Sequence, residues 1–183
     1  TIAFVKQYTQ LKGDLADKII GGSIAIDPSV LADPDVGPRM AGVVSGSSTN
    51  EDSTTPEYTQ YVETLTNSWP DSGDELIVPV GKGLFGANWA NGAEAIAQAL
   101  ESVNGDLSDG GKAFREALLQ IGADGFESVE GPITLDENRN AIGNNYIIQA
   151  TQQDDGTIVN KTLDTISDVD ESFGDNFTAS TPT

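Results

Sequence analysis

Histidine and cysteine are both absent from this sequence of 183 residues. Without cysteine, the chain can form no disulfide, no catalytic thiolate and no sulfur-bound metal site. Without histidine, it lacks the usual general base and the commonest transition-metal ligand, so serine turns such as Gly21-Gly22-Ser23 cannot belong to a Ser-His-acid triad. The abundant carboxylates single out no catalytic pair. We therefore expect a protein that is not an enzyme and that binds no cofactor or metal.

Basic residues are scarce, because 9 Lys and Arg face 29 Asp and Glu, which gives a formal net charge of −20. A surface of this charge repels phosphate backbones and anionic lipids, so we expect neither nucleic acid nor a membrane surface to be a partner. Two explanations of the charge stay open. One is a halophilic protein, in which salt screens the repulsion between acidic groups, and the other is an ordinary acidic secreted protein.

Long apolar runs are also absent, and none approaches the roughly 18 residues that a membrane-spanning helix needs. The sequence has no initial Met and no signal peptide, and it opens on Thr1 as if inside a structural element, so we expect a processed or truncated chain. With 37% hydrophobic and 21% charged residues, the composition is that of a globular protein.

The first third of the chain alternates helix and strand signals, which is typical of an α/β protein. Asp27 and Pro28 have the residue types that favour the N-cap and the first position of a helix. The predicted elements are a helix from Ile2 to Leu11, a strand over Lys18–Ser23, a short helix over Asp27–Leu31, a strand over Ala41–Ser45, and a crossover loop over Gly46–Pro56.

The remainder begins with helical patterns and changes to a period of two after residue 121. The predicted elements are helices over Thr55–Trp69, Ala90–Val103 and Gly111–Ile121, a turn over Asp71–Asp74, strands over Glu75–Val80 and Ile133–Leu135, and a hairpin whose strands, Tyr146–Ala150 and Thr157–Leu163, flank the Asp154-Asp155-Gly156 turn. Residues 168–183 are acidic and rich in Ser and Thr, and we expect a loosely held tail.

Three short motifs suggest other chemistry. Gly81-Lys82-Gly83-Leu84-Phe85-Gly86 matches a dinucleotide-binding fingerprint, but the second strand that should precede the acid at Asp106 is missing. Asp136, Asn138 and Asn140 have calcium-loop spacing, although Gly and Glu are absent from positions six and twelve, so a hairpin turn is the better interpretation. Asn160-Lys161-Thr162 and Asn176-Phe177-Thr178 are acceptor tripeptides for surface glycosylation.

Several segments, taken in order, resemble a known family. They are Phe4–Tyr8, Lys18–Ser23, Asp27–Leu31, Gly42–Val44, Ala93–Leu100, Gly131–Asn138 and the closing hairpin from Tyr146 to Asp168. Together they are similar to the C-terminal half of type I periplasmic solute-binding proteins, the receptors of branched-chain amino-acid ABC transporters. The most specific segment is Gly131-Pro132-Ile133-Thr134-Leu135-Asp136-Glu137-Asn138.

This resemblance implies an α/β fold made of parts of two Rossmann-like lobes, with the N-terminal half of the family fold absent. It assigns residues 1–45 to the second lobe, 46–144 to the first, 145–166 to the second again, and 167–183 to a tail. It also places Ser23, with Ile24 beside it, in the loop that meets the ligand amine. At the start of a late helix that faces the cleft it places Trp89 or Ala90, of which Trp89 is the better candidate. A plain loop hydroxyl for Ser23 and a core position for Trp89 are the structural alternatives.

The resemblance implies an extracytoplasmic component of an ABC transporter that binds a small amino-acid-like ligand between two lobes and presents it to the permease. The alternative is a structural protein that self-associates through strand edges and apolar surface left exposed without the N-terminal half.

Overall fold

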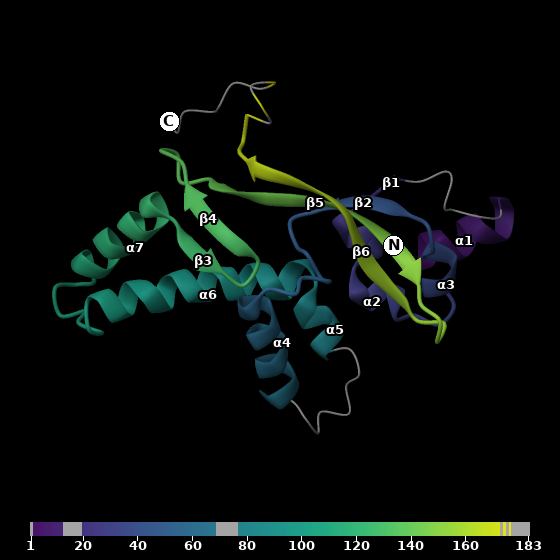
Figure 1. The fold of residues 1–183 in the computed structure, drawn as a ribbon, viewed down its shortest axis with the longest axis horizontal. Helices are drawn as coiled ribbons and strands as arrows, with labels where there is room; N and C mark the ends of the chain where they lie inside the picture. Colours follow the sequence, from purple (N-terminus) through teal and green to yellow (C-terminus); the bar gives the residue numbers. More distant parts are fainter. Residues whose placement is uncertain (1, 13–19, 69–76, 173, 175, 177–183) are drawn as a thin grey trace.

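The computed structural model describes residues 2–12, 20–68, 77–172, 174 and 176, and the fold is mixed α/β (Figure 1). In chain order the helices are α1 (Ile2–Lys12), the 3-10 helix η1 (Ser23–Ile26), α2 (Pro28–Leu31), α3 (Gly37–Met40), α4 (Pro56–Ser68), α5 (Ile77–Lys82), α6 (Leu84–Ser102) and α7 (Lys112–Asp124). The strands are β1 (Ile20–Gly22), β2 (Val44–Ser47), β3 (Phe126–Ser128), β4 (Gly131–Leu135), β5 (Ala141–Gln152) and β6 (Ile158–Val169).

The strands form one open sheet in the order β1-β2-β5-β4-β3, with β6 paired to β5 outside this path. β1 and β2 are parallel, and the other pairs are antiparallel. β5 joins β4 through Ala141 and Ile142, and joins β2 through residues 146–149. The long β5–β6 ribbon therefore runs the width of the molecule and connects its two sides (Figure 1).

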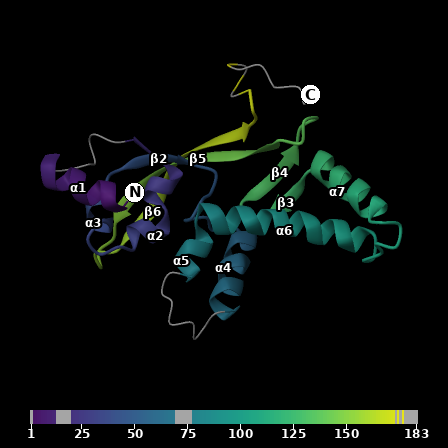
Figure 2. The same cartoon turned by 180° about the vertical axis from the view of Figure 1, so that it is seen from behind.

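Two regions lie toward the opposite ends of this ribbon, as the view from behind also shows (Figure 2). The sheet region consists of α1 to α3, η1, β1, β2 and the part of the ribbon paired with β2. The helical region consists of α4 to α7 with β3 and β4. The chain crosses from the sheet region to the helical region through residues 48–55 and returns along β5.

The main hydrophobic core lies in the sheet region, where α1, α2 and α3 pack on β5 and the end of β2. Its buried members are Val5, Ile26, Val30, Leu31, Val36, Met40, Val43, Tyr146, Ile148 and Ala150. Exposed large hydrophobic side chains occur in both regions, and they are Phe85, Trp89, Ile96, Leu107 and Leu119 in the helical region and Ile2, Phe4 and Leu11 on α1. Among the described residues, the sheet region contains the larger cluster of buried hydrophobic side chains.

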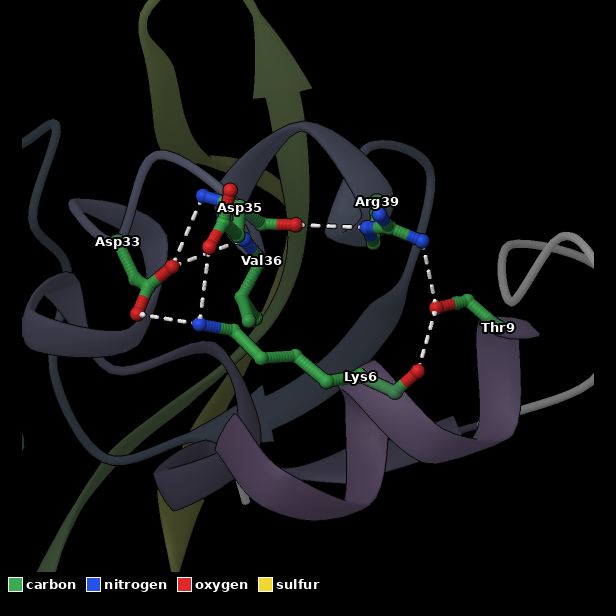
Figure 3. Close-up of polar contacts among 6 residues, drawn as sticks. All are labelled: Lys6, Thr9, Asp33, Asp35, Val36 and Arg39. Carbon is green, nitrogen blue, oxygen red and sulfur yellow. Dashed lines mark hydrogen bonds and ion pairs between the residues drawn. The ribbon is translucent and has the colours of Figure 1, made fainter.

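Polar contacts hold α1 onto the loop between α2 and α3 (Figure 3). The Lys6 Nζ lies 3.1 Å from Asp35 Oδ2 and 3.6 Å from Asp33 Oδ2. Arg39 donates from Nη1 to the Thr9 hydroxyl at 2.7 Å and from Nε to the Asp35 carbonyl at 2.7 Å. Two of the nine basic residues are thus used to attach one helix.

Most predicted elements are present, and α2 begins as predicted. The Asp27 carboxylate accepts a hydrogen bond from Ser29 N at 2.9 Å, and Pro28 takes the first helical position. The prediction of a strand over Glu75–Val80 is wrong, because Ile77–Lys82 form helix α5. A short apolar run fits a strand and a buried helix turn equally well, and Pro79 inside it was a signal against a strand.

Several boundaries also differ from the prediction, and strands β5 and β6 are longer than the predicted 146–150 and 157–163. Strand β2 is Val44–Ser47 instead of 41–45, since Gly42 has a φ of 90° and turns the chain before the strand. Helix α6 starts at Leu84, six residues before the predicted Ala90. The segment before Ala90 contains glycine, which lowers helix propensity without excluding a helix. The predicted turn over Asp71–Asp74 lies outside the described residues, as does most of the predicted acidic tail.

Candidate functional site

The two regions meet where helix α2 contacts the α5–α6 junction, and a cavity lies on one side of this contact. The cavity has a volume of about 400 Å³, and its walls are mainly apolar. We call it the α1–α6 cavity, and it is lined by Ile2, Ala3, Asp27, Ser29, Val30, Val80 and Phe85. Residues from both regions therefore share one small pocket.

Asp27 provides the buried carboxylate of the α1–α6 cavity. Its Oδ1 accepts hydrogen bonds from the Ser29 backbone N–H at 2.9 Å and from the Ser29 hydroxyl at 2.5 Å. Its Oδ2 is buried without a hydrogen-bond partner and lies beside Gly83, the N-cap of α6. The positive end of the α6 dipole faces this charge, which favours contact between the two regions.

The predicted residues Ser23 and Ile24 are at the start of η1, directly after strand β1, on the segment that leads to Asp27. Their side chains lie outside the part of the chain that the structure describes. The η1 segment ends at Ile26, directly before Asp27, which lines the α1–α6 cavity. Their predicted role in ligand binding stays a prediction.

Trp89 lies on helix α6, and its side chain is 79% exposed, so the alternative of a core aromatic is wrong. It follows Phe85 by four residues, and positions four apart share one face of a helix. Phe85 lines the α1–α6 cavity, whereas Trp89 does not. Trp89 thus lies one turn beyond the cavity on the same face of α6.

Sequence reasoning missed Asp27 as a site residue, since its pattern indicated only a helix cap. It also missed the crossing segment 50–52, which fastens the two regions to each other. The Asn50 backbone N–H donates to Glu130 Oε2 at 2.8 Å, and Glu51 Oε1 accepts from Asn160 Nδ2 at 2.9 Å. The Asp52 carboxylate accepts from the Thr162 hydroxyl at 2.7 Å. Only the tertiary structure brings residues more than 70 positions apart into these contacts.

Burial raises the pKa of the Glu51 carboxyl to about 7, and neighbouring Asp27 adds to the effect. Burial also raises the pKa of Glu130 to about 8, although the Asn50 N–H opposes the increase. Both acids titrate near neutral pH in consequence, and both hold the crossing segment. No cluster of three metal-ligating side chains is found among the described residues.

The prediction of a surface glycosylation site at Asn160 is wrong, because Asn160 is only 4% exposed and a glycan on it does not fit this folded structure. Its Nδ2 donates to the Ile26 carbonyl at 2.8 Å as well as to Glu51. For the other tripeptide, Phe177 and Thr178 lie outside the described residues.

The two remaining motifs have structural roles. Asp136 Oδ1 accepts from Asn138 N and Asn140 N, both at 2.8 Å, which is the turn that we expected. Residues 81–86 join α5 to α6, so the strand that a dinucleotide fingerprint requires before its glycines is a helix instead.

No family model matches the sequence, and no curated protein matches it. The structure, however, resembles an ABC transporter substrate-binding protein from Sphaerobacter thermophilus with a TM-score of 0.74 and 29% identity. This match covers 93% of the chain and 42% of the other. The chain has the fold of a type I solute-binding protein.

Two further solved structures of this type have the same fold. A solute-binding protein of Rhodopseudomonas palustris in complex with p-hydroxybenzoic acid has a TM-score of 0.63 and 18% identity over 91% of this chain and 40% of its own. A leucine-binding protein of Thermotoga maritima has a TM-score of 0.59 and 18% identity over 90% of this chain and 41% of its own. The predicted family resemblance and fold class are confirmed.

The chain spans about two fifths of the length of the solute-binding proteins it matches. The solved structures named here are solute-binding proteins, which are not enzymes, in agreement with the expectation from the absence of histidine and cysteine. The structure contains no helix, among its described residues, that is long and apolar enough to cross a membrane.

Proposed function

We propose that this chain is part of an extracytoplasmic solute-binding protein that delivers a small amino-acid-like ligand to an ABC permease. The observation that carries the proposal is the match over 93% of the chain to an ABC transporter substrate-binding protein. The proposed lobe boundaries are residues 1–45, 46–144 and 145–166. They agree in outline with the sheet region, the helical region and the return of the chain along β5.

The ligand would lie in the α1–α6 cavity and extend from Phe85 to Trp89, one turn farther along α6. Apolar walls from Ile2, Val30 and Phe85 suit a hydrocarbon body, as in most ligand pockets. Ser23 and Ile24 would contact the ligand from η1, and Trp89 from α6. An amine on the ligand would be attracted to the negative side of the cavity that contains Asp27.

Fluorescence titration tests this proposal. Trp69→Phe leaves Trp89 as the single tryptophan of the chain. We expect leucine or another amino acid to change Trp89 emission saturably and to raise the melting temperature, because a ligand that binds only the folded state stabilises it. Benzoate and 4-hydroxybenzoate belong in the same panel, since the Rhodopseudomonas palustris solute-binding protein of the same fold was solved in complex with p-hydroxybenzoic acid.

Ile96→Ala is the matched control for Trp89→Ala. Both side chains are exposed and apolar on α6, and Ile96 lies almost two turns farther along the helix. Trp89→Ala should weaken ligand binding, whereas Ile96→Ala should leave it unchanged. The proposal fails for this chain if no compound in the panel binds at millimolar concentration, or if the two variants lose affinity equally.

Self-association remains the alternative prediction. The feature that it would use is the exposed apolar face of α6 with Phe85, Trp89 and Ile96. Sedimentation velocity over a hundredfold range of protein concentration would test it, and a monomer throughout that range would contradict it.

A further inference from the structure

A second and larger cavity lies against the opposite face of α2. Its volume is about 760 Å³, within the range of about 300–1,000 Å³ that ligand pockets have. Pro28 and Leu31 of α2 line this cavity, whereas Asp27 and Val30 line the α1–α6 cavity. Because positions three apart share a helix face, α2 separates the two spaces. We call the larger one the α2–β6 cavity.

One wall of the α2–β6 cavity is apolar and the other is polar. The apolar wall comes from α2, the loop after it and strand β6, and includes Leu31, Pro34 and Ile158. The polar wall comes from the crossing segment, the end of α5 and β6, with Glu51, Lys82 and Asn160. This combination suits a small molecule with a hydrocarbon body and one polar head group.

The polar wall has more hydrogen-bond acceptors than the protein satisfies. The Asn160 side chain is 4% exposed, and its Oδ1 has no hydrogen-bond partner, while its Nδ2 donates to Ile26 and Glu51. A buried acceptor without a partner is costly, and it is relieved by a donor. Glu51 adds a carboxyl group that forms no ion pair within 4 Å among the described residues.

Two of the three carboxylates that line the cavity are already paired with a lysine, Asp33 with Lys6 at 3.6 Å and Asp52 with Lys161 at 3.8 Å. Glu51 is therefore the lining carboxylate that is left for a cationic ligand, with Lys82 as the competing cation on the same wall. The net charge of −20 on the whole chain raises the local concentration of small cations further.

We propose that the α2–β6 cavity binds a small organic amine, whose ammonium group is held by Glu51 and Asn160 and whose hydrocarbon body lies against Leu31, Pro34 and Ile158. This site is separate from the ligand cleft of the proposed function and does not depend on it. Since Glu51 belongs to the segment that crosses between the two regions, an amine bound there contacts the connection between them.

The affinity should depend on pH through Glu51. Its pKa is raised to about 7 by burial, so much of it is neutral at pH 6 and charged at pH 8. Asp27 from α2, Asp52 from its own segment and Lys82 from α5 are the charged groups that act on it, and Glu130 and Tyr58 respond to its charge. Amine binding should strengthen as pH rises from 6 to 8, because a charged carboxylate attracts an ammonium ion.

Calorimetric titration with 2-phenylethylamine and with 3-phenylpropionate provides the test, since the two probes have the same aromatic ring but opposite charge. We expect the amine to bind and the carboxylate to bind at least tenfold more weakly. Glu51→Gln should weaken amine binding about tenfold and remove the increase between pH 6 and 8. Lys82→Gln should strengthen amine binding, because it removes a competing cation from the same wall.

Glu116→Gln is the control variant, because it removes the same charge from α7, which contributes no residue to the cavity. A thermal melt of each variant confirms that it is folded. The proposal is overturned if the amine does not bind, if the carboxylate binds as well as the amine, or if Glu116→Gln weakens binding as much as Glu51→Gln. The last result would indicate attraction to the acidic surface alone.

Discussion

Asp27 combines two roles in one side chain, the cap of α2 and the contact with the start of α6. Replacement by Ala removes the acceptor for Ser29 N, and loss of an N-cap costs about 1 kcal/mol in the free energy of unfolding. We expect Asp27→Ala to lower stability by at least this amount in urea denaturation. Asp27→Asn keeps the cap acceptor and should recover most of the loss, so equal losses in the two variants would contradict the cap as the cause.

The raised pKa values of Glu51 and Glu130 predict how the free energy of unfolding changes with pH. Both pKa values are raised in the folded protein, to about 7 and about 8, so the folded state holds protons that the unfolded state releases above about pH 4.5. This contribution to stability is complete below pH 4.5 and is lost as the pH rises to 8. We expect the free energy of unfolding to fall by about 2–4 kcal/mol between pH 5 and 8.5.

Glu130→Gln isolates the contribution of Glu130 ionisation to this fall in the free energy of unfolding. The amide oxygen can still accept from Asn50 N, but the side chain cannot ionise. The decline with pH should therefore become shallower in Glu130→Gln. Hydrogen bonds lower the pKa values of Asp109 and Asp155 from the ordinary aspartate value, so these acids do not interfere in this window. A profile identical to that of the original chain would contradict the assignment.

At the scale of the elements, the close contact between α2 and the start of α6 depends on the absence of a side chain at Gly83. A Cβ at this position would lie 2.8 Å from Pro28 Cδ and 3.2 Å from Asp27 Oδ2. Gly83→Ala should therefore destabilise the protein. Gly92→Ala, on the same helix and with open space around the added Cβ, should stabilise it by about 0.5–1 kcal/mol through helix propensity. Urea denaturation of both variants tests the pair, and effects of the same sign would contradict this account.

Elements with a strong local signal could be predicted from the sequence. Helix α2 follows from Asp27 and Pro28, and the β5–β6 hairpin follows from Asp155 and Gly156, whose φ of 88° suits glycine. Helix α5 could not be predicted, because its apolar run has no period that separates helix from strand. The contact of Glu51 with Asn160 could not be predicted either, since no local sequence signal links positions that are 109 residues apart.

For the whole molecule, the charge of −20 predicts a strong response to salt. Repulsion among acidic groups opposes the compact state, and it is screened over about 3 Å at 1 M salt instead of about 10 Å at 0.1 M. We expect the melting temperature to rise between 0.1 and 1 M KCl. Sucrose at matched osmolality, which adds no ions, is the control, and an equal rise in both solutions would count against a halophilic protein.

The pairing of β2 with β5 also determines when this protein can fold during its synthesis. Gln149 donates to the carbonyl of Gly42, 107 positions earlier, and Tyr146, Ile148 and Ala150 complete the core that Val43 begins. While the ribosome is still making the helical region, the earlier segment can pair β1 with β2, but the apolar side chains of its helices lack strand β5, on which they pack in the folded protein. Closing such a distant contact is slow. Until the β5–β6 hairpin has been made, we therefore expect the apolar side chains of the segment before it to be more exposed to proteases and to aggregation.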